Sequence, residues 1–392
     1  MSRQDDIVVT GMGVICAGAA SVKDLWFRLQ YSHDGIGVPK HLVSAHSDLP
    51  MGEVAESNEE LGAMTHTRGL SRTALLGLYA ARQAINDAGG ICGRTAFISG
   101  TTVGNMDAAE QGFMDFFTGK RESAPGSHDC GACTLDIVEA LNHKFAFTST
   151  ISTACSSAAN AIINGAEMLR LGLIDSALVG GTEALSAFHV GGFNSLMILD
   201  PEHCRPLDES RRGLNLGEGA AYLVLERRQD AEARGARILA VLAGAANACD
   251  AYHQTATSPD GVGLELAMRQ AIADANISPS DIGYINLHGT GTQNNDATEA
   301  KAVSAVFDVI PPVSSTKYFT GHTTSASGAI EAVISIICLH KGMIPGNPGV
   351  DNPVPQLEDA ISKSPVRKDF NAVMTNSFGF GGNDSSLIFV KP

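Results

Sequence analysis

Short apolar runs that stop at glycine or at a small polar turn recur along the whole chain and alternate with helical patterns. Runs rich in Val, Ile and Ala that end in such turns are typical of buried strands, whereas apolar residues at every third or fourth position are typical of helices. This alternation predicts an α/β layered fold. The predicted strands cover residues 7–10, 96–99, 176–179, 221–225, 238–242, 283–287, 372–375 and 387–390. The predicted helices cover residues 71–88, the segment between Cys155 and Gly172, and residues 264–275.

The length of the chain, 392 residues, exceeds that of a typical single domain and favours two domains or two similar halves. Strands and helices alternate through both halves, and no short-period repeat is visible. A charged segment, residues 226–237, separates two predicted strands and is too short to be a flexible linker between domains. We therefore place the boundary near Gly235 and expect an N-terminal half of residues 1–235 and a C-terminal half of residues 236–392.

The charge balance excludes several classes of function. Lys and Arg number 27 against 42 Asp and Glu, a formal net charge of −15, whereas nucleic-acid binders normally carry a basic face. An acidic surface disfavours anionic membranes, and the longest apolar run, residues 332–339, is too short to span a bilayer. The first ten residues carry no signal-peptide pattern. The eight cysteines are scattered, and the pair Cys130 and Cys133 lacks the second pair of a zinc site. We expect a cytoplasmic protein that binds neither nucleic acid nor membranes.

Four strand-like runs end at reactive or glycine-rich turns, and ligands gather at the carboxyl ends of strands in α/β sheets. These turns are residues 153–155, 180–182, 288–290 and 376–382. Within the first of them, Cys155 lies between a strand-like run and an amphipathic helix. The helix dipole favours the thiolate at a helix N-terminus, so we expect a lowered thiol pKa and a nucleophile. The alternative is a buried structural cysteine.

Two histidines in small-residue turns, His288 and His322, complete the set that acyl transfer through a thioester requires. That set is a nucleophile and two imidazole hydrogen-bond donors. Each histidine taken alone could be structural. A nicotinamide oxidoreductase is a competing interpretation, because residues 11–13, Gly-Met-Gly after a strand, resemble the start of a dinucleotide-binding fingerprint. Cys16 stands at the third glycine position of that fingerprint, which weakens the interpretation.

Motifs of the β-ketoacyl synthases occur in order from residue 7 to the C-terminus, and the sequence resembles this family of the thiolase-like superfamily. No single motif is decisive, but the ordered series is specific. The motifs are VVTGMG at 8–13, TACSS at 153–157, GGTEA at 180–184, RPLD at 205–208, GEGA at 217–220, HGTGT at 288–292, ND at 295–296 with TE at 298–299, Lys317 with GH at 321–322, and NSFGFGG at 376–382.

The resemblance implies a five-layer αβαβα thiolase-like fold of two related halves, with Cys155 in the first half and both histidines in the second. It implies that Cys155 carries the acyl group as a thioester. His288 and His322 would then bind the thioester carbonyl of a malonyl donor during its decarboxylation. The resemblance also implies supporting roles: Lys317 and Glu331, five residues before and nine after His322, hold and tune that histidine. Phe380 serves as a gate and, with the Cys155 N–H, supplies the oxyanion hole. Thr290 and Thr292 bind the phosphopantetheine arm.

The implied reaction is a decarboxylative Claisen condensation of acyl-Cys155 with malonyl-acyl carrier protein. It yields a 3-oxoacyl product and needs no metal or other cofactor. The implied partners are an acyl carrier protein and a second copy of the chain in a homodimer. Carrier proteins of this family are acidic, so docking on a chain of net charge −15 requires a local basic patch. The candidate docking residues are Arg68, Lys120, Arg121 and Arg205.

Departures from the family pattern leave the substrate open. Gly291 stands where many relatives carry a bulkier residue or serine, and Leu207 and Leu214 stand where they carry aromatic residues. Residues 323–328, TTSASG, replace a more apolar stretch. Fatty acid synthesis is the first interpretation, and a polyketide or aryl-polyene ketosynthase with a partner subunit is the alternative. A catalytically silent partner subunit is the third, which Cys155 disfavours because such relatives lack it.

Overall fold

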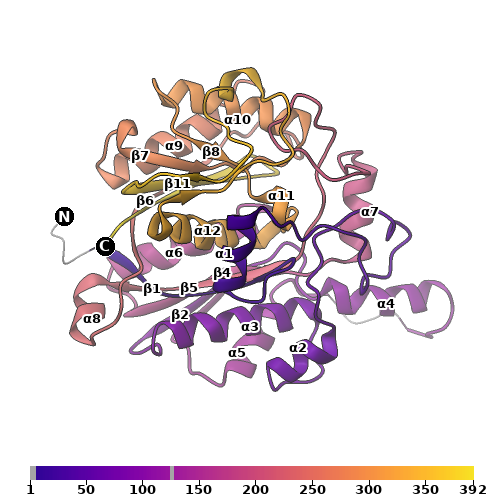
Figure 1. The fold of residues 1–392 in the computed structure, drawn as a ribbon. Coiled ribbons are helices and arrows are strands. Elements are labelled where there is room, and N and C mark those ends of the chain that lie inside the picture. The colour runs from indigo at the N-terminus through magenta and orange to yellow at the C-terminus, as the bar shows by residue number, and fades with distance from the viewer. Residues whose placement is uncertain (1–5, 124–127) are drawn as a thin grey trace.

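The computed structural model describes residues 6–123 and 128–392 as a layered α/β fold (Figure 1). Residues 1–5, the start of the segment in which we expect no signal peptide, lie outside the described residues. The strands are β1 (Ile7–Cys16), β2 (Thr95–Gly100), β3 (Phe147–Ile151), β4 (Ser176–Glu183), β5 (Gly219–Arg227), β6 (Ala240–Cys249), β7 (Ile282–Asn286), β8 (Val313–Ser314), β9 (Met343–Ile344), β10 (Val366–Arg367), β11 (Ala372–Gly379) and β12 (Asn383–Val390).

Helices connect these strands along the chain (Figure 1). They are α1 (Val22–Tyr31), α2 (Asn58–Met64), α3 (Arg72–Asp87), α4 (Met106–Phe117), α5 (Ala132–Leu141), α6 (Ser157–Arg170), α7 (Ala187–Ser195), α8 (Arg228–Ala233), α9 (Val262–Ala275), α10 (Gln293–Val306), α11 (Lys317–Thr320) and α12 (Ser327–Lys341), with short 3₁₀ turns η2 (Pro279–Asp281), η3 (Thr324–Ala326) and η4 (Pro355–Leu357).

The two halves of the sheet repeat one topology. Apart from the separate β9–β10 pair, the strand order is β3-β2-β4-β5-β1-β6-β12-β11-β7-β8. We number the five strands of each half in chain order and read each half from the outer edge of the sheet to its centre. Both halves then have the order third, second, fourth, fifth, first, and their parallel and antiparallel pairings also correspond. The halves join where β1 meets β6, through the pairs Val8–Val241 and Val9–Ala240 alone. The prediction of two related halves is therefore confirmed.

Helices form three layers around the two half-sheets (Figure 1). Helices α6 and α12 lie between them, since α6 packs on β2 and β4 while α12 packs on β5 and β11. The outer face of the first half-sheet is covered by α3, against which α5 packs, and that of the second by α9, against which α10 packs. This is the predicted five-layer αβαβα arrangement. The predicted boundary at residue 235 lies between α8 and β6, and the division of the chain at that residue stays a prediction.

Strand β1 is longer than predicted, because residues 11–13 continue it instead of forming a turn. Their glycines allow α3 to pack closely on the strand. A Cβ on Gly11 would stand 2.3 Å from the carbonyl oxygen of Ala84, and a Cβ on Gly13 would stand 2.1 Å from that of Ala80. The resemblance to a dinucleotide-binding turn is therefore wrong, since these glycines serve helix–sheet packing.

Strand β4 likewise runs through Gly180 and Gly181 to Glu183. The prediction of a turn at residues 180–182 is wrong, because close approach of neighbouring backbone, and not chain reversal, requires the glycines. A Cβ on Gly180 would stand 2.0 Å from the carbonyl oxygen of Ala221 on the paired strand β5. The predicted helices are confirmed as α3, α6 and α9, and Ser71 caps α3 through its side chain as a serine N-cap should.

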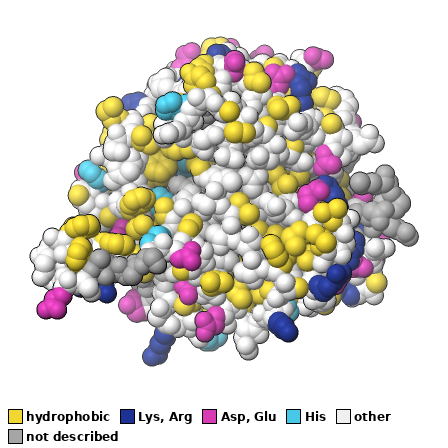
Figure 2. Space-filling model, turned by 180° about the vertical axis from the view of Figure 1, so that it is seen from behind, with side chains coloured by type: hydrophobic (Ala, Val, Ile, Leu, Met, Phe, Trp, Pro, Cys, Tyr) yellow, Lys and Arg dark blue, Asp and Glu magenta, His cyan; other side chains and the backbone are white. Residues whose placement is uncertain are grey.

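The surface carries no single dominant charge patch on the side shown in Figure 2, where acidic side chains are scattered and basic ones lie among them. Hydrophobic side chains gather in groups on the same face (Figure 2). Among residues 6–123 and 128–392, no helix combines the length and the apolar character that a membrane crossing requires.

Candidate active site

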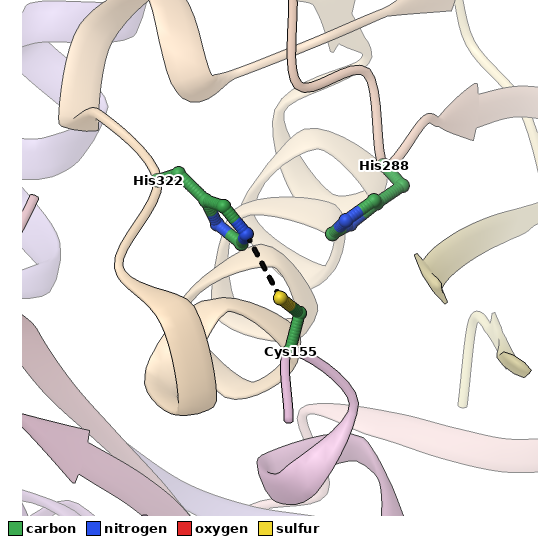
Figure 3. Close-up of side chains that lie close together, drawn as sticks. All are labelled: Cys155, His288 and His322. Atoms are coloured by element: carbon green, nitrogen blue, oxygen red, sulfur yellow. Dashed lines mark hydrogen bonds between the residues drawn. The ribbon is translucent and has the colours of Figure 1, made fainter. Parts of the chain in front are cut away.

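Cys155 follows β3 and stands just before the N-cap of α6, Ser156. Its side chain is 5% exposed. The preceding residue, Ala154, has a φ of 52°, a left-handed conformation that residues other than glycine adopt uncommonly. Backbone strain of this kind is concentrated at functional turns. The turn directs the sulfur of Cys155 toward two histidines from the other half of the chain (Figure 3).

His288 and His322 both reach this sulfur from turns of the second half. His288 follows β7, and His322 follows α11. The Nε2 atom of His322 lies 3.0 Å from the Sγ atom of Cys155, and the two imidazole rings lie 5.2 Å apart at 83° (Figure 3). Ligand atoms of all three side chains lie within 4.8 Å of one another. The structure thus brings together the three residues that the sequence indicated, at the junction of the two halves.

Burial raises the pKa of the Cys155 thiol to about 11. The positive charge of Lys317 and the backbone N–H groups of Phe380 and Cys155 lower this pKa, but by less than burial raises it. The predicted lowering of the thiol pKa by the helix N-terminus is therefore wrong for this structure. Loss of hydration outweighs this charge and these N–H groups, and Cys155 consequently needs a base to become a nucleophile.

Lys317 connects His288 to Glu331. Its Nζ atom lies 3.2 Å from Nδ1 of His288 and 2.5 Å from Oε1 of Glu331, and it also donates to the carbonyl oxygen of His288. All three side chains are buried. Since an ammonium group only donates, Nδ1 of His288 must accept, and the ring proton resides on Nε2. Lys317, held by Glu331, thus fixes the tautomer of His288 with its Nε2–H available as a donor. The prediction that Lys317 and Glu331 hold His322 is wrong, because the Lys317 side chain reaches the histidine of the other turn.

Burial also lowers the pKa of both histidines well below the usual value of 6.5, and the nearby charge of Lys317 acts in the same direction. Both imidazoles are therefore neutral near pH 7. The turn that carries His288 is held by Glu299 on α10, which accepts hydrogen bonds of 2.8 Å from the backbone N–H groups of His288 and Gly289. Glu299 belongs to a motif that the sequence indicated, but its anchoring role was not predicted.

A cavity of about 340 Å³ opens onto Cys155 and both histidines. Its lining includes the predicted residues Thr290, Thr292 and Phe380, and the ring of Phe380 stacks on that of Phe193 at a centroid distance of 5.9 Å. Four further lining residues were named in the sequence but given no role in a cavity: Leu214, Asn295, Phe378 and Gly379. The lining residues that sequence reasoning missed are Phe193, Met197, Ile198, Arg212, Thr255, Ala256, Thr257, Gln293 and Asn294. They lie outside the quoted motifs, so nothing in the sequence singled them out.

The three single positions that depart from the family pattern each have a place in the structure. Gly291 has a φ of 87°, and a Cβ there would stand 2.5 Å from the carbonyl oxygen of Gly213, so the close approach of these loops requires glycine. Leu214 lines the cavity and Leu207 is fully buried. The glycine at position 291 is therefore explained by the packing of its loop against the loop of Gly213.

The four candidate docking residues are exposed side chains. Arg205 lies 3.6 Å from Asp351 in a surface ion pair. Among the described residues, none of the four lines the cavity. Their role in docking stays a prediction.

The cluster of Cys155, His288 and His322 is also chemically able to hold a metal ion, because thiolate and imidazole are the usual ligands of zinc. A metal would have to compete with the proton that the raised pKa of Cys155 keeps on sulfur. Cys130 and Cys133 do not belong to a metal-ligating group of three within the described residues. Our expectation that the reaction uses no metal stays a prediction.

Two family models together match most of the chain. The model described as "Beta-ketoacyl synthase, N-terminal domain" matches residues 4–231, and the one described as "Beta-ketoacyl synthase, C-terminal domain" matches residues 239–351. A curated relative, 3-oxoacyl-[acyl-carrier-protein] synthase 2 of Vibrio harveyi, is 32% identical over 412 residues, which cover 98% of each chain.

Solved structures resemble the chain over nearly its full length. One is "The ishigamide ketosynthase/chain length factor", with a TM-score of 0.93, 29% identity, and coverage of 99% of this chain and 100% of that one. Another is a type II PKS acyl-carrier protein in complex with its ketosynthase bound to the hexaketide, with a TM-score of 0.88, 26% identity, and the same coverage.

Proposed function

The chain belongs to the β-ketoacyl synthase family, and from this premise we propose that it condenses an acyl group held on Cys155 with a malonyl group borne by an acyl carrier protein. The single observation that carries the proposal is the contact of 3.0 Å between His322 Nε2 and Cys155 Sγ beside His288, in one cavity. A catalytically silent subunit would need none of these three side chains.

The first step loads the acyl group. Cys155 is a thiol at neutral pH, so His322 accepts its proton at Nε2 while the sulfur attacks the carbonyl carbon of an acyl thioester. The new C–S bond forms, the old C–S bond breaks, and His322 returns the proton to the departing carrier thiolate. A neutral His322 suits this task, because an imidazolium has no lone pair to accept the proton.

Negative charge on the carbonyl oxygen in this step requires hydrogen-bond donors. The backbone N–H groups of Phe380 and of Cys155 itself both lower the pKa of the Cys155 thiol, as hydrogen-bond donors beside a sulfur do. These two groups form the proposed oxyanion hole. Gly379 allows the approach, since a Cβ on it would stand 3.2 Å from the backbone nitrogen of Cys155.

The second step makes the carbon–carbon bond. The Nε2–H of His288, fixed by Lys317, and the Nε2–H of His322 donate to the carbonyl oxygen of the malonyl thioester. The bond to the malonyl carboxylate breaks, CO2 leaves, and the electron pair forms an enolate that these donors stabilise. The enolate carbon attacks the acyl carbonyl on Cys155, the C–S bond breaks, and the released thiolate takes up a proton. The product is a 3-oxoacyl thioester of the carrier.

Ser327 offers His322 a partner that suits both steps. Its Oγ atom lies 3.4 Å from Nδ1 of His322, and a hydroxyl can either accept from or donate to that nitrogen. During loading, Nδ1 carries the proton and Nε2 accepts. During decarboxylation, Nδ1 accepts and Nε2 donates.

The decisive experiment separates the two steps. The purified chain is incubated with acyl-carrier protein and its intact mass is measured, and CO2 release from malonyl-carrier protein is measured in parallel. We expect an acyl adduct that Cys155→Ala abolishes, and CO2 release that a change of His288 or His322 abolishes. Absence of both adduct and CO2 release would refute a condensing enzyme and favour a silent subunit.

The second candidate is polyketide chemistry, which the structural similarity to the ketosynthase of a type II PKS, bound to the hexaketide, favours. The two candidates differ in the acyl group and not in the steps above. A panel of saturated, unsaturated and 3-oxo acyl groups on the carrier distinguishes them. Preference for saturated chains supports fatty acid synthesis, whereas preference for unsaturated or oxygenated chains supports polyketide or aryl-polyene synthesis.

A homodimer in the cytoplasm completes the proposal. Strand β3 is an edge strand, since it pairs with β2 alone, and its residue Phe147 is 43% exposed. An uncovered edge with an exposed aromatic side chain is suited to pairing with another strand. Sedimentation of the chain alone should therefore give a dimer, and a monomer would indicate that a different subunit covers this edge.

A further inference from the structure

Glu183, at the end of β4, is a buried acidic residue that the proposed steps do not use. Its side chain is 1% exposed. The carboxylate accepts hydrogen bonds from the turn that follows β2: 3.1 Å from Thr101 Oγ1, and 2.6 Å from both the N–H and the Oγ1 of Thr102. Buried carboxylates require such donors, because burial without them is costly.

The same carboxylate also accepts from the turn that follows His322. Ser325 Oγ lies 2.5 Å from Oε2 of Glu183, and Thr324 Oγ1 lies 3.5 Å from it. These hydroxyls belong to residues 323–328, which depart from the apolar family pattern. Glu183 therefore ties the segment after His322 to the end of β4.

The tied segment has a conformation that needs support. Thr324 is β-branched, yet its φ is 45°, which is an outlier for such a residue. Strained residues of this kind persist where the surrounding contacts determine them. Glu183 supplies such contacts: a short one with Ser325, three residues after His322, and a longer one with Thr324, two residues after it.

The other side of His322 is held separately. Its N–H donates to the carbonyl oxygen of Asn215 over 2.8 Å, and its own carbonyl oxygen accepts from the N–H of Gly217 over 2.9 Å. These contacts fix the backbone of His322 but leave the direction of the following turn open. In that turn Ser325 and Thr324 contact Glu183, and Ser325 Oγ also lies 3.3 Å from the carbonyl oxygen of Thr182, the residue before Glu183.

We propose that Glu183 is a positioning residue for His322, which anchors residues 324 and 325 so that Nε2 stays within hydrogen-bond distance of the Cys155 sulfur. The proposal rests on the role given above to His322 as the partner of Cys155. It also explains the hydroxyl groups at positions 324 and 325, since a carboxylate can accept hydrogen bonds from hydroxyl groups but not from the apolar side chains of the family pattern.

The test is alkylation of Cys155 by iodoacetamide, followed by peptide mapping because Cys92 and Cys249 are exposed. The variants are Glu183→Ala, Glu183→Gln and Ser325→Ala. The matched control is Ser335→Ala, which removes a buried hydroxyl of α12 that has no hydrogen-bond partner among the described residues. At about pH 8 we expect Glu183→Ala to slow alkylation by about 10- to 100-fold, because small misplacement of a reacting group costs up to that much. The alkylation rates of Glu183→Gln and Ser325→Ala should lie between the rate of Glu183→Ala and that of the control, which should equal the wild-type rate.

The pH dependence separates positioning from mere loss of structure. If His322 is displaced, the difference from wild type narrows as the pH approaches about 11, where the thiol ionises without a base. Loosening of the fold would instead expose Cys155 and speed alkylation at every pH. An unchanged or faster rate in Glu183→Ala at about pH 8 would overturn the proposal. The assay needs neither carrier nor malonyl group, so its result stays readable if the condensing activity fails.

Discussion

His322 Nε2 lies 3.0 Å from Cys155 Sγ although 167 positions separate the two residues in the chain. Cys155 follows strand β3 of the first half, whereas His322 follows helix α11 of the second half. The two half-sheets pair directly at only two positions of β1 and β6. Helix α6 begins shortly after Cys155, and helix α12 begins shortly after His322. These two helices pack against each other between the half-sheets. The geometry of the site thus depends on how these two middle helices pack.

The low histidine pKa values predict that activity persists into acid. A histidine with a lowered pKa stays neutral until the pH falls below that pKa, and only its neutral form can accept the proton of Cys155. The rate of Cys155 acylation should therefore show no protonation step near the usual histidine pKa of 6.5. Its kcat/KM measured from about pH 5 to 8 tests this. A loss of activity centred at pH 6.5 would contradict the lowered pKa values of His322 and His288.

Breaking the Lys317–Glu331 pair should affect both activity and stability. Lys317→Met removes the donor that fixes the His288 tautomer, and CO2 release from the malonyl group should fall by at least about 100-fold. It also leaves Glu331 buried without its partner, at a cost of about 3–5 kcal/mol in the free energy of unfolding.

The double variant Lys317→Met/Glu331→Leu is the control for this prediction. It should recover most of the stability but none of the CO2 release, because it removes the unpaired charge without restoring the donor to His288. Urea unfolding measures the first and CO2 release the second. Recovery of both would show that Lys317 acts on stability alone.

Gly13→Ala should destabilise the fold strongly. The new Cβ would stand 2.1 Å from the carbonyl oxygen of Ala80 and would push α3 away from β1. Overpacking of this kind costs about 1–3 kcal/mol, and a backbone oxygen cannot move aside as a flexible side chain can. Gly37→Ala is the matched control, since no atom lies within 4 Å of its new Cβ. Urea unfolding should show a change within about 0.5 kcal/mol for the control. Equal stabilities would contradict the close packing.

Reversing the charge of Lys120 and Arg121 together should weaken carrier-protein docking. Both side chains are exposed, and charge pairs at the rim of an interface mainly affect the association rate and its salt dependence. We expect KM for acyl-carrier protein to rise by about 10-fold at low salt, with kcat unchanged. The matched control is the double reversal of Arg367 and Lys368, an adjacent exposed basic pair elsewhere in the chain. If both double variants behave alike, residues 120 and 121 do not form the docking site.

Much of the fold followed from local patterns. The strand and helix segments predicted from periodicity are present, with ends displaced by a few residues. The errors lie at segments that contain glycine: residues 11–13, 180–182 and 376–379 continue their strands, although glycine commonly marks a turn. The predicted turn at 376–382 is thus wrong for its first four residues, which belong to β11. Glycine in a strand allows a helix or a neighbouring backbone to pack closely on it. Such an approach depends on the tertiary structure, so the local sequence does not indicate it.

The site shows the same division. The identities of Cys155, His288 and His322 followed from their turns and from the ordered motifs, since a nucleophile and two donors need those side chains. The anchoring residues Glu183 and Glu299 were part of motifs but had no predicted role. Their partners come from other segments, and no local pattern indicates which backbone N–H or hydroxyl will face a carboxylate.

The sequence by itself determined the alternation of strands and helices, the repeat of that alternation in two halves, and the residue types able to perform acyl transfer. Only the tertiary structure decided the 3.0 Å contact of His322 with Cys155 and the direction of the thiol pKa, which rises where the helix position alone predicted a fall. The physical reason is that periodicity is a property of neighbours in the chain. The hydration of a thiol, by contrast, is removed by every segment that packs around its sulfur. At Cys155 that loss outweighs the positive charge and the backbone N–H groups that lower the pKa.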